Sequence, residues 1–321
     1  MNKRPHPDLR FPARTDQRWS SPRPRSSYPL SSRRDALVKC ILPAMIKLFR
    51  TSDAVLAVRG DEAFALNAFS FDALFRSAEP DIFVEEALRT AHSIALPDVA
   101  QTWLPPLESQ EVWAAGVTYF RSRVARMEES EGAGADRFYD KVYAADRPEL
   151  FFKATASRVR GHLGAVGIRQ DSTWSVPEPE LTLALNAAGE VFGFTIGNDM
   201  SARDIEGENP LYLPQAKMYR GSCALGPCLL MGTKLPNSAA AVDLSIERGG
   251  AVVFEGHTAL DQLKRGFEEL AGWLFKEDDF PNGCLLMTGT GIVPDAGFTL
   301  QSGDRIRIAI EGIGELENPV V

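Results

Sequence analysis

The sequence predicts a β-rich α+β fold with a small α/β unit near its N-terminus. Beyond residue 106 the chain consists mostly of short apolar segments punctuated by Gly and Pro, which is typical of strands and turns. No repeat, Gly-rich phosphate loop or dinucleotide fingerprint is present. The 321 residues, with 44% hydrophobic and 24% charged side chains, suffice for one large or two modest globular domains.

Residues 1–44 are predicted to be a disordered basic extension rich in Pro, Arg and Ser. Residues 1–35 hold nine Lys and Arg against three Asp and Glu, a balance of +6. Such a segment buries too little apolar surface to offset the entropy lost on ordering. Four interpretations stay open: an over-extended reading frame preceding Met45, a functionless extension, a transit peptide, or an arm that binds nucleic acid or anionic lipid.

Residues 45–105 are predicted to form the small α/β domain, and residues 106–321 the catalytic domain. Residues 45–49 and 54–58 read as strands around a turn, and 82–93 as a helix with Asp81 as N-cap. Paired prolines at the junction favour a domain boundary there.

The catalytic domain is predicted to be an antiparallel or mixed sheet. Residues 181–185 and 191–197 read as a hairpin. Further strands are expected at 228–232, 241–246, 251–255 and 305–310, and one amphipathic helix at 260–275.

Charge and composition exclude several classes of protein. Residues 45–321 hold 25 Lys and Arg against 40 Asp and Glu, a balance of −15 that argues against a nucleic-acid enzyme. No apolar run approaches the roughly 18 residues of a membrane span. The four cysteines form no metal-type cluster, which favours a reducing, cytoplasmic location.

Three carboxylates lie close together in the sequence: Glu178, Glu180 and Asp199. In an extended segment residues i and i+2 share a face, so Glu178 and Glu180 project together. No Lys or Arg lies close to Glu178 and Glu180 in the sequence, so a divalent cation is the natural neutraliser of this pair. An all-oxygen set favours Mg²⁺, Mn²⁺ or Ca²⁺ over zinc.

The hairpin register decides whether Asp199 joins this pair. In a hairpin, the numbers of two residues paired across the strands have a constant sum. If that sum is 377, Asp199 lies opposite Glu178 on the same face. A sum of 376 places it on the other face, because a one-residue slip inverts the pleat. The alternative to a metal site is a solvated acidic strand edge with an unrelated turn aspartate.

A set of motifs resembles the fumarylacetoacetate hydrolase superfamily. These are Glu178-Pro-Glu180, Asn198-Asp199-Met-Ser-Ala-Arg-Asp204, Lys217 and Thr288-Gly-Thr290. The resemblance covers roughly residues 105–321. It implies a mixed β-roll core and a Mg²⁺ site, with Mn²⁺ as an alternative, held by Glu178, Glu180 and Asp199.

A closer resemblance is to the branch of 2-dehydro-3-deoxy-D-arabinonate (D-xylonate) dehydratases. It rests on the segments 142–155, 177–181 and 204–221. It implies dehydration of a C5 2-keto-3-deoxy acid to 2-oxoglutarate semialdehyde in oxidative pentose catabolism. Lys217 and Glu149 are then the catalytic candidates. The candidates for contact with substrate are Thr290, Thr118, Tyr119 and Arg123.

One departure from the family pattern bears on the reaction. Hydrolase members commonly carry a His and a Glu that activate water, where this chain has Ser122 and Ala125. Loss of a general base costs about 10²–10⁴-fold in rate, which argues against hydrolysis. Acylpyruvate hydrolysis, oxaloacetate decarboxylation and 2-keto acid isomerisation are the rival activities. A binding protein with a basic arm is the rival from another class.

The expected partners follow from the same reasoning. We expect the protein to act on a small-molecule 2-keto acid and to bind neither nucleic acid nor membrane. The resemblance implies a homodimer or homotetramer.

Overall fold

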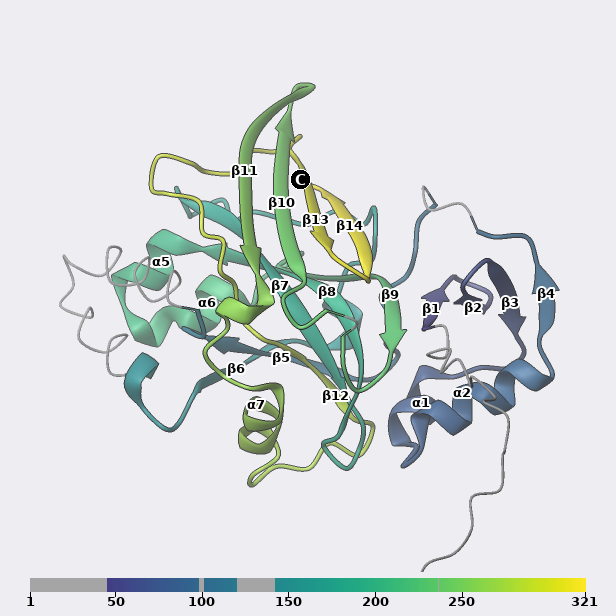
Figure 1. Ribbon diagram of the computed structural model, residues 1–321. Helices are drawn as coiled ribbons and strands as arrows, with labels where there is room; N and C mark the ends of the chain where they lie inside the picture. The colour runs from purple at the N-terminus through teal and green to yellow at the C-terminus, as the bar shows by residue number, and fades with distance from the viewer. Residues whose placement is uncertain (1–44, 98–100, 120–141, 236) are drawn as a thin grey trace, which may run out of the picture. The chain divides into compact units, whose positions relative to one another are not determined.

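The computed structural model describes residues 45–97, 101–119, 142–235 and 237–321 (Figure 1). The predicted extension 1–44 lies outside these residues. Within the described residues two sheets form, a mixed ten-stranded sheet and an antiparallel four-stranded one. The prediction of a β-rich α+β fold is confirmed. The described residues contain no helix long and apolar enough to span a membrane.

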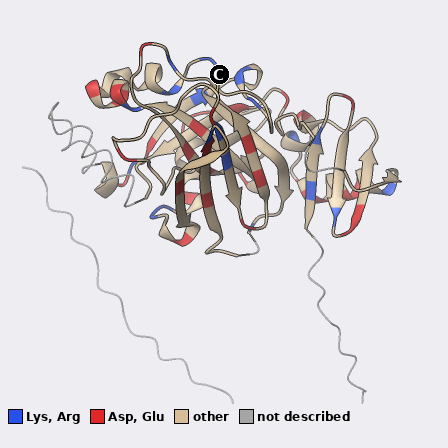
Figure 2. Ribbon diagram, turned by 90° about the horizontal axis from the view of Figure 1, so that it is seen from above, with Lys and Arg blue, Asp and Glu red and all other residues tan. Residues whose placement is uncertain are grey.

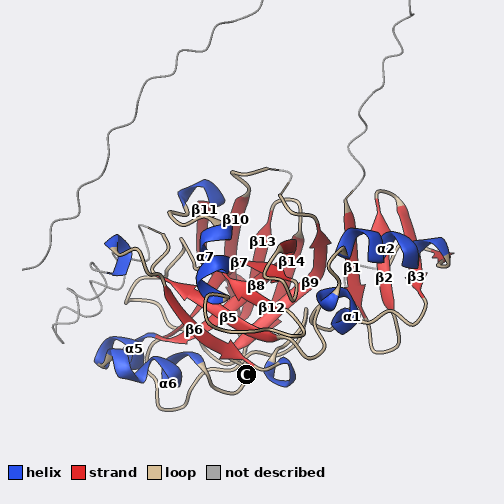
Figure 3. Ribbon diagram, turned by 90° about the horizontal axis from the view of Figure 1, so that it is seen from below, coloured by secondary structure: helices blue, strands red, loops and turns tan. Residues whose placement is uncertain are grey.

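The N-terminal part of the large sheet carries two helices on one face (Figure 3). Its elements are β1 (Ile46–Arg50), β2 (Val55–Arg59), β3 (Glu62–Leu66), α1 (Phe71–Arg76), α2 (Pro80–Arg89) and β4 (His92–Ile94). Apolar side chains of α1 and α2, such as Phe71, Leu74 and Val84, pack against Leu48 and Ala57 of the strands. Strand β1 also pairs with β9, so these strands continue directly into the sheet of the predicted catalytic domain.

The helix expected at 82–93 differs from the observed α2 at both ends. It begins at Pro80 after the N-cap Glu79, and Asp81 lies in its first turn. Pro fits here because the first turn of a helix needs no donor from it. The last predicted residues form β4 instead, because His92–Ile94 pair with β3.

The remaining strands of the large sheet surround β7 and β8. Their bounds are β5 (Glu111–Gly116), β6 (Glu149–Ala154), β7 (Ser175–Leu185), β8 (Val191–Ala202), β9 (Cys223–Met231) and β12 (Cys284–Met287). The strand order is β4-β3-β2-β1-β9-β8-β7-β12-β5-β6, and β12 runs parallel to β5. Every residue of β7 and β9 is buried, because elements cover both faces of the sheet there.

The smaller sheet lies across the large one (Figure 1). It contains β10 (Ala241–Arg248), β11 (Ala251–Ala259), β13 (Arg305–Ile310) and β14 (Gly314–Pro319). Along β13, Ile306, Ile308 and Ile310 are buried while Arg305 and Arg307 are exposed, so the period of two fixes its inner face. The predicted strand 305–310 is confirmed residue by residue.

The helix predicted over 260–275 was too long. The structure has a short η3 (Leu260–Gln262) and a helix α7 (Phe267–Leu274), separated by an irregular stretch. Lys264 N–H donates to the Thr118 carbonyl over 3.0 Å, and Leu263 bridges to Tyr119. These backbone contacts with a distant segment interrupt a pattern that the local sequence favours as helix.

Candidate metal centre and active site

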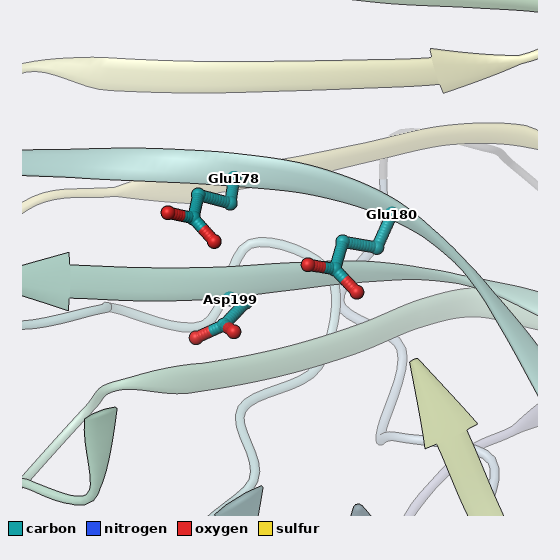
Figure 4. A group of neighbouring side chains, drawn as sticks. All are labelled: Glu178, Glu180 and Asp199. Atoms are coloured by element: carbon teal, nitrogen blue, oxygen red, sulfur yellow. The ribbon is translucent and has the colours of Figure 1, made fainter. Parts of the chain in front are cut away.

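Strands β7 and β8 bring the three predicted carboxylates together (Figure 4). Glu178 is paired with Asp199, so the hairpin adopts the register that sums to 377. One carboxylate oxygen from each of Glu178, Glu180 and Asp199 lies within 4.8 Å of the others. The register shifts only between Ala184 and Leu185, near the turn, and leaves the carboxylates on one face.

Two prolines flank these carboxylates inside β7. Pro177 pairs with Met200 and Pro179 with Asn198. The Arg203 N–H donates to the Trp174 carbonyl over 2.7 Å. In an antiparallel pair only every second residue bonds to the partner strand, so the even-numbered residues of β7 face β8 with their backbone groups. The backbone groups of Pro177 and Pro179 therefore point away from β8. Strand β12 on that side pairs only with Thr182–Leu185. The missing proline donors therefore leave no ladder hydrogen bond unmade.

The three carboxylates are almost fully shielded from solvent. Relative exposures are 5% for Glu178, 2% for Glu180 and 1% for Asp199. Burial, together with the charges of Asp199 and Glu178, raises the pKa of Glu180 well above its ordinary value. A solvated strand edge is thereby excluded.

Buried protein cations surround two of the three carboxylates, contrary to the expectation from the local sequence. Lys217 Nζ, at the end of α6 (Leu213–Lys217), donates to Glu178 over 2.7 Å and to Asp199 over 3.2 Å. Arg203, first residue of α5 (Arg203–Glu208), forms an ion pair with Glu178. The local sequence around the carboxylates does not reveal these ion pairs, because Arg203 and Lys217 belong to the helices α5 and α6 and not to β7 or β8.

Lys153 on β6 is the cation that sequence reasoning missed entirely. Its ammonium forms an ion pair with Asp199 and donates to the carbonyls of Met200 (3.1 Å) and Lys217 (2.6 Å). It is 1% exposed, so its charge is compensated inside the protein. Two signals were present in the sequence: Lys153 lies in the segment 142–155 that resembles the dehydratases, and it interrupts an apolar run, Leu150-Phe-Phe-Lys153-Ala, where a charge needs a buried partner.

Glu180 differs from its two neighbours. It accepts the Gly289 N–H over 2.6 Å, but within the described residues no Lys or Arg forms an ion pair with it. A buried carboxylate beside two others, without its own cation, fits a metal ligand. The donor set of three carboxylates therefore suits a hard divalent cation.

The triad lines a small cavity. It is lined by Ala115, Gly116, Val117, Phe151, Glu178, Glu180, Asp199, Arg203, Lys217, Gly289 and Thr290. Glu206, also buried, lies 3.9 Å from Lys217 Nζ and 3.8 Å from Arg203 Nη1. With all four buried carboxylates ionised, they and the three buried cations carry one net negative charge. A divalent cation would reverse that sign and favour a singly charged anionic ligand.

Of the other predicted site residues, Thr290 lines this cavity and Glu149 lies next to it. Glu149 starts β6 opposite Gly116, and a Cβ on Gly116 would overlap its carboxylate. Thr290 lines the cavity, with its hydroxyl donating to the Ile292 carbonyl over 3.1 Å. Arg123 lies outside the described residues.

Thr118 and Tyr119 support the turn that follows β12. The Thr118 hydroxyl donates to the Thr288 carbonyl over 2.7 Å, and a Cβ on Gly289 (φ +91°) would overlap that hydroxyl. Tyr119 is buried against Gly291, and burial together with the Glu180 charge raises the pKa of its hydroxyl. Direct contact with substrate stays a prediction for both residues.

The histidine and cysteines near the site serve packing. His162 Nδ1 accepts the Glu317 N–H over 3.1 Å, and burial lowers its pKa. Cys223, Cys228 and Cys284 are buried and free. Burial raises the pKa of the Cys223 thiol to about 12, so it is inert at neutral pH.

Comparisons with known proteins agree with this geometry. The family model described as fumarylacetoacetate (FAA) hydrolase C-terminal matches residues 112–321. The chain belongs to the fumarylacetoacetate hydrolase family. It is 46% identical over 216 residues to a probable 2-keto-3-deoxyxylonate dehydratase of Haloferax volcanii, covering 67% of this chain and 73% of that protein.

Two further relatives carry related names. A 2-dehydro-3-deoxy-D-arabinonate dehydratase of Saccharolobus solfataricus is 42% identical over 217 residues, covering 67% of this chain and 73% of that protein. A solved structure of 2-keto-3-deoxy-D-arabinonate dehydratase, complexed with magnesium and 2,5-dioxopentanoate, aligns with a TM-score of 0.72 and 33% identity. The alignment covers 86% of this chain and 98% of that one.

The raised pKa of Glu180 predicts how pH and metal act on stability. The folded metal-free protein binds this proton more tightly than the unfolded chain, whose carboxyl titrates near 4.5. Glu180 therefore costs the metal-free protein stability as pH rises from that value through its folded pKa. Mg²⁺ offsets the cost, so the Tm gain on adding Mg²⁺ should be larger at pH 8 than at pH 5. Equal gains in calorimetry at both pH values would contradict this.

Proposed function

We propose that this chain is a Mg²⁺-dependent dehydratase of 2-dehydro-3-deoxy-D-pentonate, giving 2-oxoglutarate semialdehyde in oxidative pentose breakdown. The observation that carries the proposal is the buried triad of Glu178, Glu180 and Asp199 beside Lys217. Its support is the similarity to dehydratases, one of which has a structure with magnesium and 2,5-dioxopentanoate.

The charge of the cavity agrees with a 2-keto acid as substrate. With a divalent cation bound, the four ionised carboxylates, the three buried side-chain cations and the metal carry one net positive charge, with Glu149 at the cavity wall not counted. A single substrate carboxylate neutralises that charge. When bound by the triad, the cation supplies Lewis-acid polarisation of the substrate C2 carbonyl. Arg203, held against Glu178, keeps that ligand in place.

Two groups of the chain are available to move protons. The reaction removes a proton from C3 and hydroxide from C4, a further proton shift from C5 to C3 gives an enol, and loss of the enol hydroxyl proton with protonation of C4 gives the aldehyde. Lys217 Nζ lines the cavity beside the triad, and the Glu149 carboxylate lies against the cavity wall at Gly116. We assign the base at C3 and the acid at C4 to this pair, without dividing the roles.

The assay that tests the function couples product to NADP⁺ reduction. The protein is incubated with 2-dehydro-3-deoxy-D-pentonate and Mg²⁺, and a semialdehyde dehydrogenase reports the 2-oxoglutarate semialdehyde formed. Turnover that EDTA abolishes and Mg²⁺ restores is the expected result. Cleavage of an acylpyruvate without dehydration would overturn the proposal and favour a hydrolase.

Gly116→Ala tests Glu149 without removing it. The new Cβ overlaps the Glu149 carboxylate and forces it to move. A displacement of about 1 Å can cost about 10²-fold in kcat. Mg²⁺ affinity should stay unchanged, because Gly116 contributes no ligand.

The matched control for Gly116→Ala is Gly272→Ala in α7, where a Cβ meets open space. Activity equal to that of the natural protein in Gly116→Ala would exclude Glu149 from the reaction. Loss of activity in both variants would point to the preparation rather than to Glu149.

A further inference from the structure

Basic residues gather in two stretches of an otherwise acidic chain. Residues 151–170 contain Lys153, Arg158, Arg160 and Arg169 and no Asp or Glu. Residues 209–242 contain Lys217, Arg220 and Lys234 and again no Asp or Glu. Lys153 and Lys217 are used in the site already described, whereas the arginines are not.

The fold places these two stretches side by side. Arg160 N–H donates to the Cys223 carbonyl over 2.9 Å, and Gly167 N–H donates to the Gly221 carbonyl over 3.0 Å. Gly221 has φ +75°, and a Cβ on Gly167 would lie 2.6 Å from the Arg220 carbonyl oxygen. Only glycines permit this approach, so the backbone itself holds the two stretches together.

The two stretches line adjoining pockets on the surface. Both pockets share Arg160, Tyr219, Arg220 and Gly221, and Arg158 lines one of them. We call the surface formed by Arg158, Arg160 and Arg220 the arginine groove. Val321 also lines it, and Figure 2 shows several blue segments close to the C-terminal end of the chain.

The three arginines of the groove are exposed, and the part of the chain that the structure describes gives them no anionic side-chain partner. Within the described residues none of them forms an ion pair or a side-chain hydrogen bond. Arg169 beside them is different, since its guanidinium binds Asp171 over 2.7 Å. Among the described residues that line the groove, Asp171 alone has a carboxylate side chain, and this pair neutralises it.

We propose that the arginine groove binds a small phosphate-bearing anion. Three like charges in one concavity repel one another unless an anion lies between them. Guanidinium groups present paired donors that match phosphate oxygens. A phosphate group near neutral pH carries close to two negative charges, which matches three cations better than a monocarboxylate does.

A nucleic acid is the less suitable ligand. Such a polymer would extend beyond the groove over a chain whose residues 45–321 carry a balance of −15. Repulsion along that surface opposes the contact. A small ligand meets only the groove.

The test is a calorimetric titration of the full-length chain with its Mg²⁺, at constant ionic strength. Inorganic phosphate and glycerol phosphate are the probes, and succinate is the dicarboxylate comparison. We expect saturable binding of one phosphate per chain. Arg160→Ser and Arg220→Ser should each weaken it about tenfold or more, because each removes charge-assisted hydrogen bonds.

The matched control is Arg89→Ser, which removes an exposed arginine of α2 outside the groove and should leave phosphate affinity unchanged. Tighter binding of glycerol phosphate than of free phosphate identifies a phosphate ester, and the reverse identifies the free ion. Equal or tighter binding of succinate overturns the phosphate assignment. Non-saturable binding, or equal weakening in Arg89→Ser, overturns the groove as a site.

Discussion

Glu180→Gln is expected to weaken Mg²⁺ binding by more than about 100-fold and to abolish turnover. Mutation of a residue that only hydrogen-bonds to a metal ligand already lowers metal affinity about 10–100-fold, so loss of the ligand itself should lower it further. The metal-free variant should be as stable as the natural protein or more so. A neutral amide avoids the burial and carboxylate repulsion that raise the pKa of Glu180, and its oxygen can still accept the Gly289 N–H.

Two measurements separate this expectation from simple unfolding. Calorimetric titration gives the Mg²⁺ affinity, and thermal unfolding with and without Mg²⁺ gives the stability. In the natural protein, Mg²⁺ at 100 times its Kd should add about 2.7 kcal/mol, and in the variant almost nothing.

Glu317→Gln is the control for Glu180→Gln. Glu317 is a buried carboxylate of β14, paired with Arg305 and Arg307 and separate from the triad. Its loss should lower stability without changing Mg²⁺ affinity. Mg²⁺ affinity within threefold of the natural value in Glu180→Gln would show that the triad is not the metal site.

Lys217→Met is expected to lower kcat by about 10²–10⁴-fold while Mg²⁺ still binds. The lysine is a candidate proton-transfer group, and it also contacts Glu178 and Asp199. Removing a cation beside two ligands makes the triad more negative, so Mg²⁺ affinity should hold or increase. The metal-free variant should lose about 3–5 kcal/mol of stability, because a buried ion pair is broken.

Lys153→Met is the matched comparison for Lys217→Met. Both lysines are buried and contact Asp199, but Lys153 does not line the cavity. If Lys217 moves a proton, its variant should lose far more kcat at saturating Mg²⁺ than Lys153→Met does. Equal losses in the two variants would mean that Lys217 acts through charge and packing alone.

Much of the site could be predicted because its ligands are close in sequence. Glu178 and Glu180 share a face in any strand, and a hairpin is the simplest connection to Asp199. The resemblance to a family then added Lys217 and Glu149. The same local reasoning overextended the helix at 260–275, where contacts with residues 118 and 119 interrupt the helical pattern.

The sequence by itself determined the β-rich fold and the identity of the three carboxylates, since alternation and i, i+2 spacing are local properties of a strand. Only the tertiary structure decided the register that joins Asp199 to Glu178. It also decided that Lys153 and Arg203 form ion pairs with two of the carboxylates, whereas Glu180 has no ion pair among the described residues. Electrostatic energy depends on distance in space and on burial, and a chain's local pattern specifies neither.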